Sequence, residues 1–164
     1  MMTTVFKSKR SIFTLAAAVI IPLLVGGLSA FLTAGDMNIY ESFSRPFLAP
    51  PGWVFPIVWT LLYIVMGTAS FLVYESDENA ETKRNALIPY TAQLVMNLFW
   101  STLFFTYRQY LIALIWLMIM WVMILITTIR FFRIRKEAGL MMGALLVWST
   151  FAAYLNLSWY ILSI

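Results

Sequence analysis

Residues 54–74 read VFPIVWTLLYIVMGTASFLVY, an apolar and aromatic stretch without a single charged side chain. An α-helix rises about 1.5 Å per residue, so a helix of this length covers about 30 Å, the thickness of the hydrocarbon core of a bilayer. The stretch therefore predicts a transmembrane helix. Composition agrees, because 62% of the 164 residues are hydrophobic and only 11% are charged, a balance typical of membrane proteins rather than soluble domains.

Four further stretches share this character. The sequence predicts five spans, at residues 12–34, 54–74, 87–107, 111–129 and 140–162, and none contains a charged side chain. We therefore expect an all-α integral membrane protein, in which residues 1–164 form a single bundle of five transmembrane helices joined by short loops. The longest loop, residues 35–53, follows the first span.

Basic residues predict the orientation of this bundle. Of the 11 Lys and Arg residues, only Arg45 and Arg108 lie in the first and third loops, and all the others precede the first span or lie in the second and fourth loops. The positive-inside rule then places the N-terminus in the cytoplasm and the C-terminus outside. The first stretch is too long for the apolar core of a cleaved signal peptide, so we expect an uncleaved span.

The absence of two residue types excludes several kinds of chemistry. The chain contains no Cys and no His, which removes thiol nucleophiles, disulfides, ordinary zinc sites, imidazole bases and the commonest haem ligand. We expect no metal site and no resident cofactor. The basic residues cluster beside the spans rather than along one polar face, so topology accounts for them and no nucleic-acid partner is expected.

Polar and aromatic residues recur at helical spacing in four of the five spans. In lipid a polar side chain needs a partner within the protein, so such stripes mark the faces that point inward. The stripes are Pro22, Gly26, Ser29 and Thr33; Trp59, Tyr63, Gly67, Ser70 and Tyr74; Gln93, Asn97, Trp100, Ser101 and Phe104; and Trp148, Ala152, Asn156 and Trp159. They predict a central pocket for a flat apolar ligand. The alternative is that these residues only hold the helices together.

The span at 111–129 offers no polar group except two indoles, so we expect it to face lipid or an oligomeric partner. Two pairs of small residues, Gly26 with Ala30 and Gly139 with Gly143, have the four-residue spacing that permits close helix packing. This spacing is compatible with a homodimer. It is also frequent in spans by chance.

The first loop is predicted to cover the pocket. Trp59, Trp100 and Asn156 lie five to seven residues from the outer ends of their spans, a depth of about 8–10 Å. They are therefore expected to meet in the outer half of the membrane, beneath this loop. Prolines stiffen the loop and favour a preformed lid. The lid residues singled out are Arg45, Pro46, Pro50 and Pro51.

Four motifs carry a resemblance that spans essentially the whole chain. They read PPGWVF at 50–55, WTLLY at 59–63, NLFWS at 97–101 and WSTFAAYLN at 148–156. In these segments the chain resembles the TspO/MBR family, the group of the translocator protein or peripheral-type benzodiazepine receptor, whose members are five-helix bundles. The resemblance implies a bacterial member, located in the plasma membrane, that binds porphyrins or haem-like tetrapyrroles.

The resemblance also implies a ligand pocket. The family's pocket positions correspond to Tyr40, Trp59, Asn97, Trp100, Trp148 and Ala152, and the stripes add Tyr63 and Asn156. The indoles are expected to stack on a macrocycle, the Asn97 amide to bond ring nitrogens or polar substituents, and Arg45 to pair with a propionate. The family usually has tryptophans where this chain has Ile39 and Leu48 and a lysine in place of Arg45, so contacts of the lid differ in detail.

Three functions remain open on this basis. The first is a receptor or carrier for tetrapyrroles, and the second is light-dependent porphyrin degradation in the same pocket, with Trp59 and Trp148 as candidate participants. The third, a proton-coupled exporter of lipophilic cations, needs a protonatable residue within the membrane, and the spans hold none of the charged types. Sterol binding is not predicted, because no basic residue follows Tyr154 or Tyr160.

Overall fold

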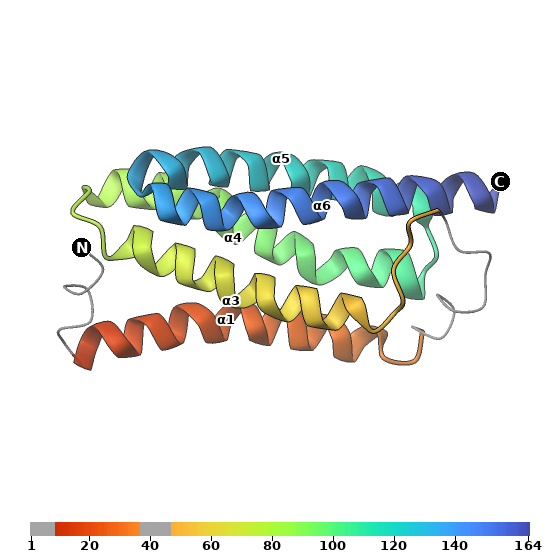
Figure 1. Cartoon of the computed structure of the whole chain (residues 1–164), viewed down its shortest axis with the longest axis horizontal. Coiled ribbons are helices and arrows are strands. Elements are labelled where there is room, and N and C mark those ends of the chain that lie inside the picture. The colour runs from red at the N-terminus through yellow and green to blue at the C-terminus, as the bar shows by residue number, and fades with distance from the viewer. Residues whose placement is uncertain (1–8, 37–46) are drawn as a thin grey trace.

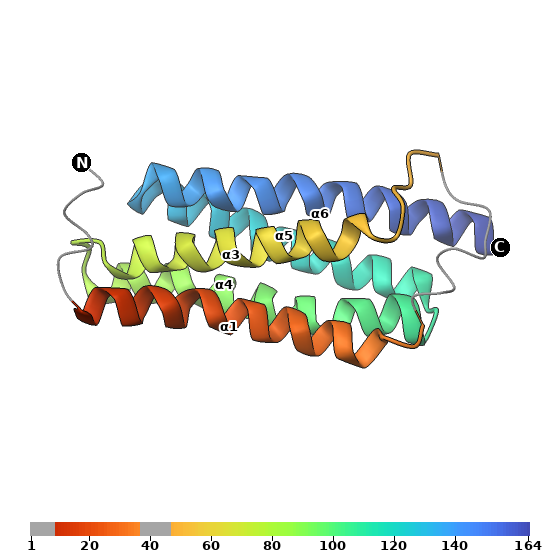
Figure 2. The same ribbon diagram turned by 60° about the horizontal axis from the view of Figure 1, so that its bottom comes forward.

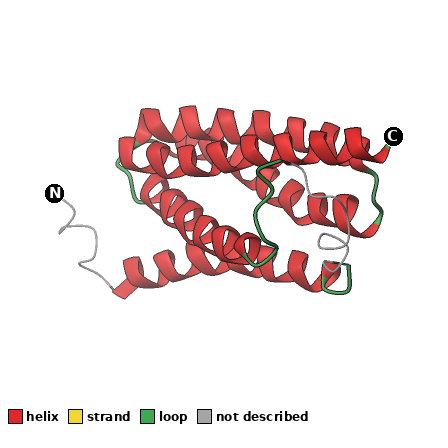
Figure 3. Cartoon of the chain, turned by 45° about the vertical axis from the view of Figure 1, so that its right-hand side comes forward, coloured by secondary structure: helices red, strands yellow, loops and turns green. Residues whose placement is uncertain are grey.

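A computed structural model describes residues 9–36 and 47–164. Its helices are α1 (Lys9–Thr33), α3 (Val54–Tyr74), α4 (Ala80–Ser101), the short π-helix η2 (Thr102–Thr106), α5 (Tyr110–Ile134) and α6 (Lys136–Ser163). The described residues form helices and connecting loops, with no strand (Figure 3). The predicted span 54–74 coincides with α3, and the predicted span 87–107 corresponds to the second part of α4 together with η2.

The five long helices lie side by side along one axis (Figures 1 and 2). Helix α1 begins at one end of the bundle and α6 ends at the other (Figure 1). The most extensive contacts join α5 to α6, α1 to α3 and α4 to α5, whereas α3 and α4 touch only briefly. The bundle thus consists of two helix pairs that are joined by α4 and by contacts between α3 and α6, and the sparse contact between α3 and α4 leaves room for a cavity.

Four helices, α1, α3, α5 and α6, are long and apolar enough to cross a membrane. Helix α4 is less apolar than these four because it begins with a polar turn. In that turn the Asn79 side chain accepts a hydrogen bond from the Thr82 N–H at 2.8 Å. Helix α4 also carries the amides of Gln93 and Asn97, which are 0% and 3% exposed. Both amides face the inside of the bundle, so α4 fits as the fifth helix of a multi-pass membrane protein.

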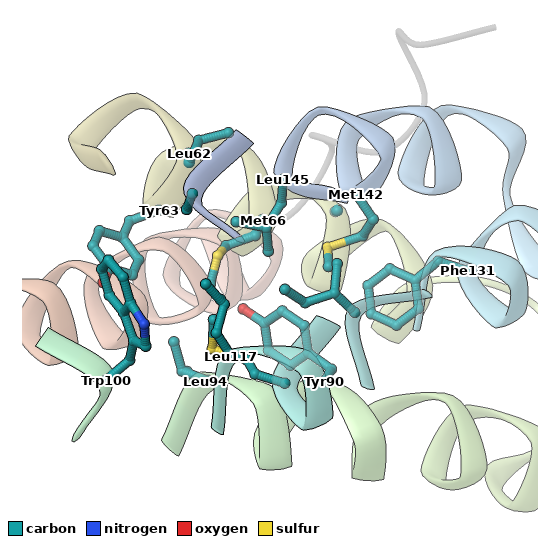
Figure 4. Close-up of a cluster of buried hydrophobic side chains, with 14 of the residues drawn as sticks. Leu62, Tyr63, Met66, Tyr90, Leu94, Trp100, Leu117, Phe131, Met142 and Leu145 are labelled. Atoms are coloured by element: carbon teal, nitrogen blue, oxygen red, sulfur yellow. The ribbon is translucent and has the colours of Figure 1, made fainter. Parts of the chain in front are cut away.

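Helix α5 exposes more of its residues than it buries, yet one of its faces also packs into the core. That face is buried against α4 and α6 along the whole helix, at Ala113, Leu117, Met120, Ile124, Thr127 and Phe131. Leu117 and Phe131 lie among Tyr90, Met142 and Leu145 in the core (Figure 4). This buried face is almost wholly apolar, so no stripe of polar residues marks it in the sequence.

Small residues set the closest helix contacts within the chain. A Cβ at Gly67 would lie 2.5 Å from the carbonyl oxygen of Ala18, so α1 and α3 approach each other at a point where only glycine fits. A Cβ at Gly139 would collide with Phe132 of α5. Gly139 therefore serves the α5–α6 pair, and the homodimer stays a prediction.

Candidate functional site

A cavity of about 260 Å³ lies between α1, α3 and the α4–η2 segment. Four of the residues predicted to bind ligand line it: Trp59, Tyr63, Asn97 and Trp100. The rest of its wall is formed by Leu23, Gly26, Gly27, Ser29, Ala30, Thr33, Phe55, Pro56, Thr60, Ser101 and Phe105. The wall is mostly apolar and aromatic, and the described residues that form it include no carboxylate and no basic group.

The cavity is not fully enclosed. Several residues that line it, from both α1 and α3, are exposed on the outside of the bundle: Gly27, Ala30, Pro56 and Thr60. In a membrane protein these positions border the lipid. An apolar ligand can therefore reach the cavity from the side, without first crossing a polar surface.

Gly26 brings the backbone of α1 against the Tyr63 ring. A Cβ at Gly26 would fall within that ring, and Tyr63 itself is only 6% exposed. The Tyr63 ring is also packed against Trp59, with ring centroids 5.7 Å apart. The absence of a side chain at Gly26 thus allows the Trp59–Tyr63 pair to form one wall of the cavity.

Asn97 supplies a deeply buried amide to the cavity wall. Its Oδ1 accepts a hydrogen bond from the Tyr63 hydroxyl at 3.1 Å, and its Nδ2 has no partner among the described residues. A buried donor left without a partner costs about 1–3 kcal/mol. Because Asn97 lines the cavity, its amide is available to an acceptor on a bound ligand.

Asn156 holds Trp100 in place rather than facing the large cavity. The Trp100 Nε1–H donates to Asn156 Oδ1 at 3.3 Å, and Asn156 Nδ2 donates to the carbonyl of Tyr110 at 2.9 Å. On its other side Trp100 stacks on Phe104, with centroids 5.4 Å apart. Trp100 is therefore fixed by α5, α6 and η2 while it lines the cavity.

The predicted site is divided by aromatic side chains. Ala152 and Asn156 line a second space of about 20 Å³, which shares Phe55, Trp100 and Phe105 with the large cavity. Such a volume holds about one water molecule. Trp148 lines neither space; its ring lies 6.1 Å from that of Phe55, and its Nε1 is buried without a partner among the described residues.

The π-helix η2 accounts for the placement of these aromatic rings. Its hydrogen bond from the Tyr107 N–H to the Thr102 carbonyl, at 3.0 Å, spans five residues instead of four. The wider turn brings Phe105 to the cavity while Phe104 lies under Trp100. Such short π-turns are frequent at functional sites, and no sequence pattern used above signals one.

Hydroxyl groups attach α1 to the far wall of the cavity. The Ser29 hydroxyl bonds the Leu98 carbonyl at 3.3 Å and also pairs with the Ser101 hydroxyl. At the end of α1, the Thr106 hydroxyl donates to Asp36 Oδ2 at 2.7 Å. The stripes identified Ser29 and Ser101, whereas Asp36 and the cavity residues Gly27 and Ala30 belong to no stripe.

The described part of the first loop, residues 47–53, leads into α3. The Pro51 carbonyl accepts from the Val54 N–H at 3.0 Å, and the Phe47 carbonyl accepts from the Tyr154 hydroxyl of α6 at 2.7 Å. Neither Pro50 nor Pro51 lines the cavity. Tyr40, Arg45 and Pro46 lie outside the described residues, so their predicted roles stay predictions.

The groups of the cavity wall are suited to binding a ligand. Within residues 9–36 and 47–164 no group of His, Cys, Asp and Glu is arranged to hold a metal ion. The wall offers flat aromatic faces, the hydroxyls of Ser, Thr and Tyr and one unpaired amide. These groups suit a flat, mostly apolar molecule with a few hydrogen-bond acceptors.

Known proteins resemble this chain over most of its length. The model of the TspO/MBR family matches residues 18–161. The tryptophan-rich protein TspO of Chlorobaculum tepidum is 34% identical over 148 residues, which cover 90% of this chain and 94% of the relative. The tryptophan-rich sensory protein of Cereibacter sphaeroides is 35% identical over 71% of this chain and 72% of its own length. The translocator protein of Bos taurus is 31% identical over 84% of this chain and 82% of its own.

Proposed function

The chain belongs to the TspO/MBR family of integral membrane proteins, and from this premise we propose that it is a receptor or carrier that binds a porphyrin or related tetrapyrrole in the cavity between α1, α3 and α4. The observation that carries the proposal is the cavity itself. Its wall combines aromatic faces with one buried amide donor that has no partner among the described residues. A tetrapyrrole is flat, largely apolar and carries nitrogen and carboxylate acceptors, so it matches both features.

Size constrains how such a ligand sits. Pockets for small ligands usually measure about 300–1,000 Å³, and this cavity, at about 260 Å³, lies just below that range. A macrocycle would therefore insert one edge between Trp59 and Trp100 and leave the other edge in the opening beside Gly27 and Ala30. The polar substituents would then lie at the rim, where water and lipid headgroups are within reach.

Each wall residue has a defined part in this proposal. Trp59 stacks on the inserted edge of the macrocycle, and the unpaired amide N–H of Asn97 donates to an acceptor on the ligand. Trp100, held by Asn156, forms the opposite face. Light-dependent porphyrin degradation is the second candidate function, because the Trp59 indole lines the cavity and would lie against the macrocycle. We place the N-terminus in the cytoplasm and the protein in a bacterial plasma membrane.

Quenching of tryptophan fluorescence by protoporphyrin IX tests the proposal. The purified protein in detergent is titrated in the dark, as are Trp59→Phe, Asn97→Ala and the control Trp121→Phe, whose indole bonds Thr150 outside the cavity. Loss of about 1 kcal/mol of stacking or hydrogen bonding predicts a Kd about five-fold higher for the first two variants. The control should bind like the wild type.

Unchanged affinity in both cavity variants would refute the assigned site. Illumination of the saturated complex then distinguishes the two candidate functions. A defined porphyrin product that forms with the wild type and not with Trp59→Phe identifies the degrading activity. Stable porphyrin under light supports the receptor or carrier.

A further inference from the structure

A second, larger concavity lies on the outside of the bundle, at the end where α1 begins. It has a volume of about 880 Å³ and is lined by residues from the end of α3 and the first half of α4. These two segments lie near the start of α1 along the bundle axis (Figure 2). The residues that line the concavity are Tyr74, Ala80, Lys83, Arg84, Leu87, Ile88, Thr91, Ala92 and Val95. We call this surface the α4 groove. It shares no residue with the cavity described above.

The α4 groove is basic at one end and apolar along the rest. Lys83 and Arg84 lie at its polar end, and Lys83 Nζ donates to the Tyr74 carbonyl at 2.9 Å, which fixes the ammonium at the rim. An ammonium has three donors, so two remain for another partner. Arg84 is exposed, and its guanidinium can form paired hydrogen bonds with a phosphate.

The length of the groove matches one leaflet of a membrane. From Arg84 to Val95 α4 advances eleven residues, which is about 16 Å at about 1.5 Å per residue. Half of a hydrocarbon core of about 30 Å is about 15 Å. Tyr74, which is 52% exposed beside the basic end, is of the type that concentrates at the membrane–water interface. The charged end is therefore at headgroup level and Val95 near the midplane.

We propose that the α4 groove is a binding site for an anionic phospholipid, with the phosphate at Lys83 and Arg84 and one acyl chain along Leu87, Ile88, Ala92 and Val95. Basic residues at the membrane surface attract anionic lipids, and basic pockets beside helices hold their headgroups. A second copy of this chain fits less well, because it would bury Arg84 and would have to supply an anion to pair with it. The function of such a lipid would be to hold the ends of α3 and α4 together, where the helices themselves touch little.

Acidic residues of the nearby turn do not occupy the groove. Glu75, Asp77, Glu78 and Glu81 are near in sequence, yet none of them lines it. Glu81 lies one turn before Arg84, closer to the aqueous end of α4. A phosphate between Lys83 and Arg84 would therefore meet two cations directly and the carboxylates at a greater distance, where water and salt screen them.

Competitive lipid binding, read by native mass spectrometry, tests the site. The full chain in detergent is offered phosphatidylglycerol and phosphatidylcholine with the same acyl chains. Lys83→Gln with Arg84→Gln removes both cations, and Arg133→Gln with Lys136→Gln is the matched control, with the same charge loss at the same end of the bundle. At about five-fold per cation, the first double variant should lose about 25-fold in preference for phosphatidylglycerol.

Two further variants separate the headgroup from the chain. Lys83→Arg with Arg84→Lys keeps both charges and should retain the preference, whereas Ala92→Phe should weaken binding of either lipid by filling the apolar part. An unchanged preference in the Gln double variant, or an equal loss in the matched control, would overturn the proposal. Equal thermal stabilisation by glycerol phosphate, which has no acyl chain, would also overturn it, because it would indicate a site for free phosphate.

Discussion

Adjacent glycines on α1 provide a matched test of the cavity wall. A Cβ at Gly26 would fall within the ring of Tyr63, whereas a Cβ at Gly27 would have no atom within 4 Å. Gly26→Ala and Gly27→Ala therefore add the same methyl group to neighbouring positions of one helix, and only the first should disturb the packing. Tyr63 has little freedom to move aside, because it packs on Trp59 and bonds Asn97.

The two variants share one energy term and differ in another. Replacing Gly by Ala within a helix stabilises it by about 1 kcal/mol, and this gain is common to both. Overpacking of a filled interior costs about 1–3 kcal/mol and applies to Gly26→Ala alone. We expect Gly27→Ala to be stabilised by up to about 1 kcal/mol and Gly26→Ala to be less stable than Gly27→Ala by about 1–3 kcal/mol.

Unfolding in mixed detergent micelles of rising dodecyl sulfate content, followed by tryptophan fluorescence, measures this difference. The same samples titrated with protoporphyrin IX report on the cavity, because displacement of Tyr63 also withdraws its hydrogen bond from Asn97. Weaker binding is therefore expected for Gly26→Ala. Gly27 itself lines the cavity, so Gly27→Ala is the control for stability and not for binding. Equal stabilities of the two variants would show that Gly26 is not packed against Tyr63, and the reasoning about this wall would be wrong.

Two further predictions concern the polar contacts around the cavity. Asn156→Leu removes the acceptor of the Trp100 Nε1–H, and leaving that buried donor unpaired should lower the free energy of unfolding by about 1–3 kcal/mol. Ser158→Ala on the same helix is the control, and a loss of equal size there would contradict the role of Asn156. Ser101→Ala breaks the pair with Ser29 and should cost only about 0.6 kcal/mol, the average for such bonds between membrane helices. A loss several times larger in the same unfolding assay would contradict this estimate.

The burial of polar side chains was predicted well from the sequence. Ser29, Asn97 and Asn156 were expected to point inward, and all three are buried. The reason is physical, since hydrocarbon offers a polar side chain no partner and only the protein interior does. The five long helices were also predicted, from the length of the apolar stretches, and the bounds of α3 were predicted to the residue.

Apolar residues carried much less information. A leucine can face lipid or protein at little difference in free energy, so Leu117 and Phe131 of α5 gave no sign that they lie in the core. The division of the predicted site has a similar origin. Whether Phe55 and Phe105 fill the space between Trp59 and Ala152 depends on side-chain rotamers and on the π-turn of η2, which helical periodicity does not encode.

The most direct test of the binding cavity is to fill it. Ala30 lines the cavity, and Ala17, on the same helix, is exposed and lies outside it. Protoporphyrin IX is titrated in the dark into Ala30→Phe, Ala17→Phe and the wild type. A ligand in this cavity predicts a Kd about ten-fold higher or more for Ala30→Phe, a loss of about 1.4 kcal/mol, with Ala17→Phe within about two-fold of the wild type. Equal affinities in all three proteins would place the ligand elsewhere and contradict the account.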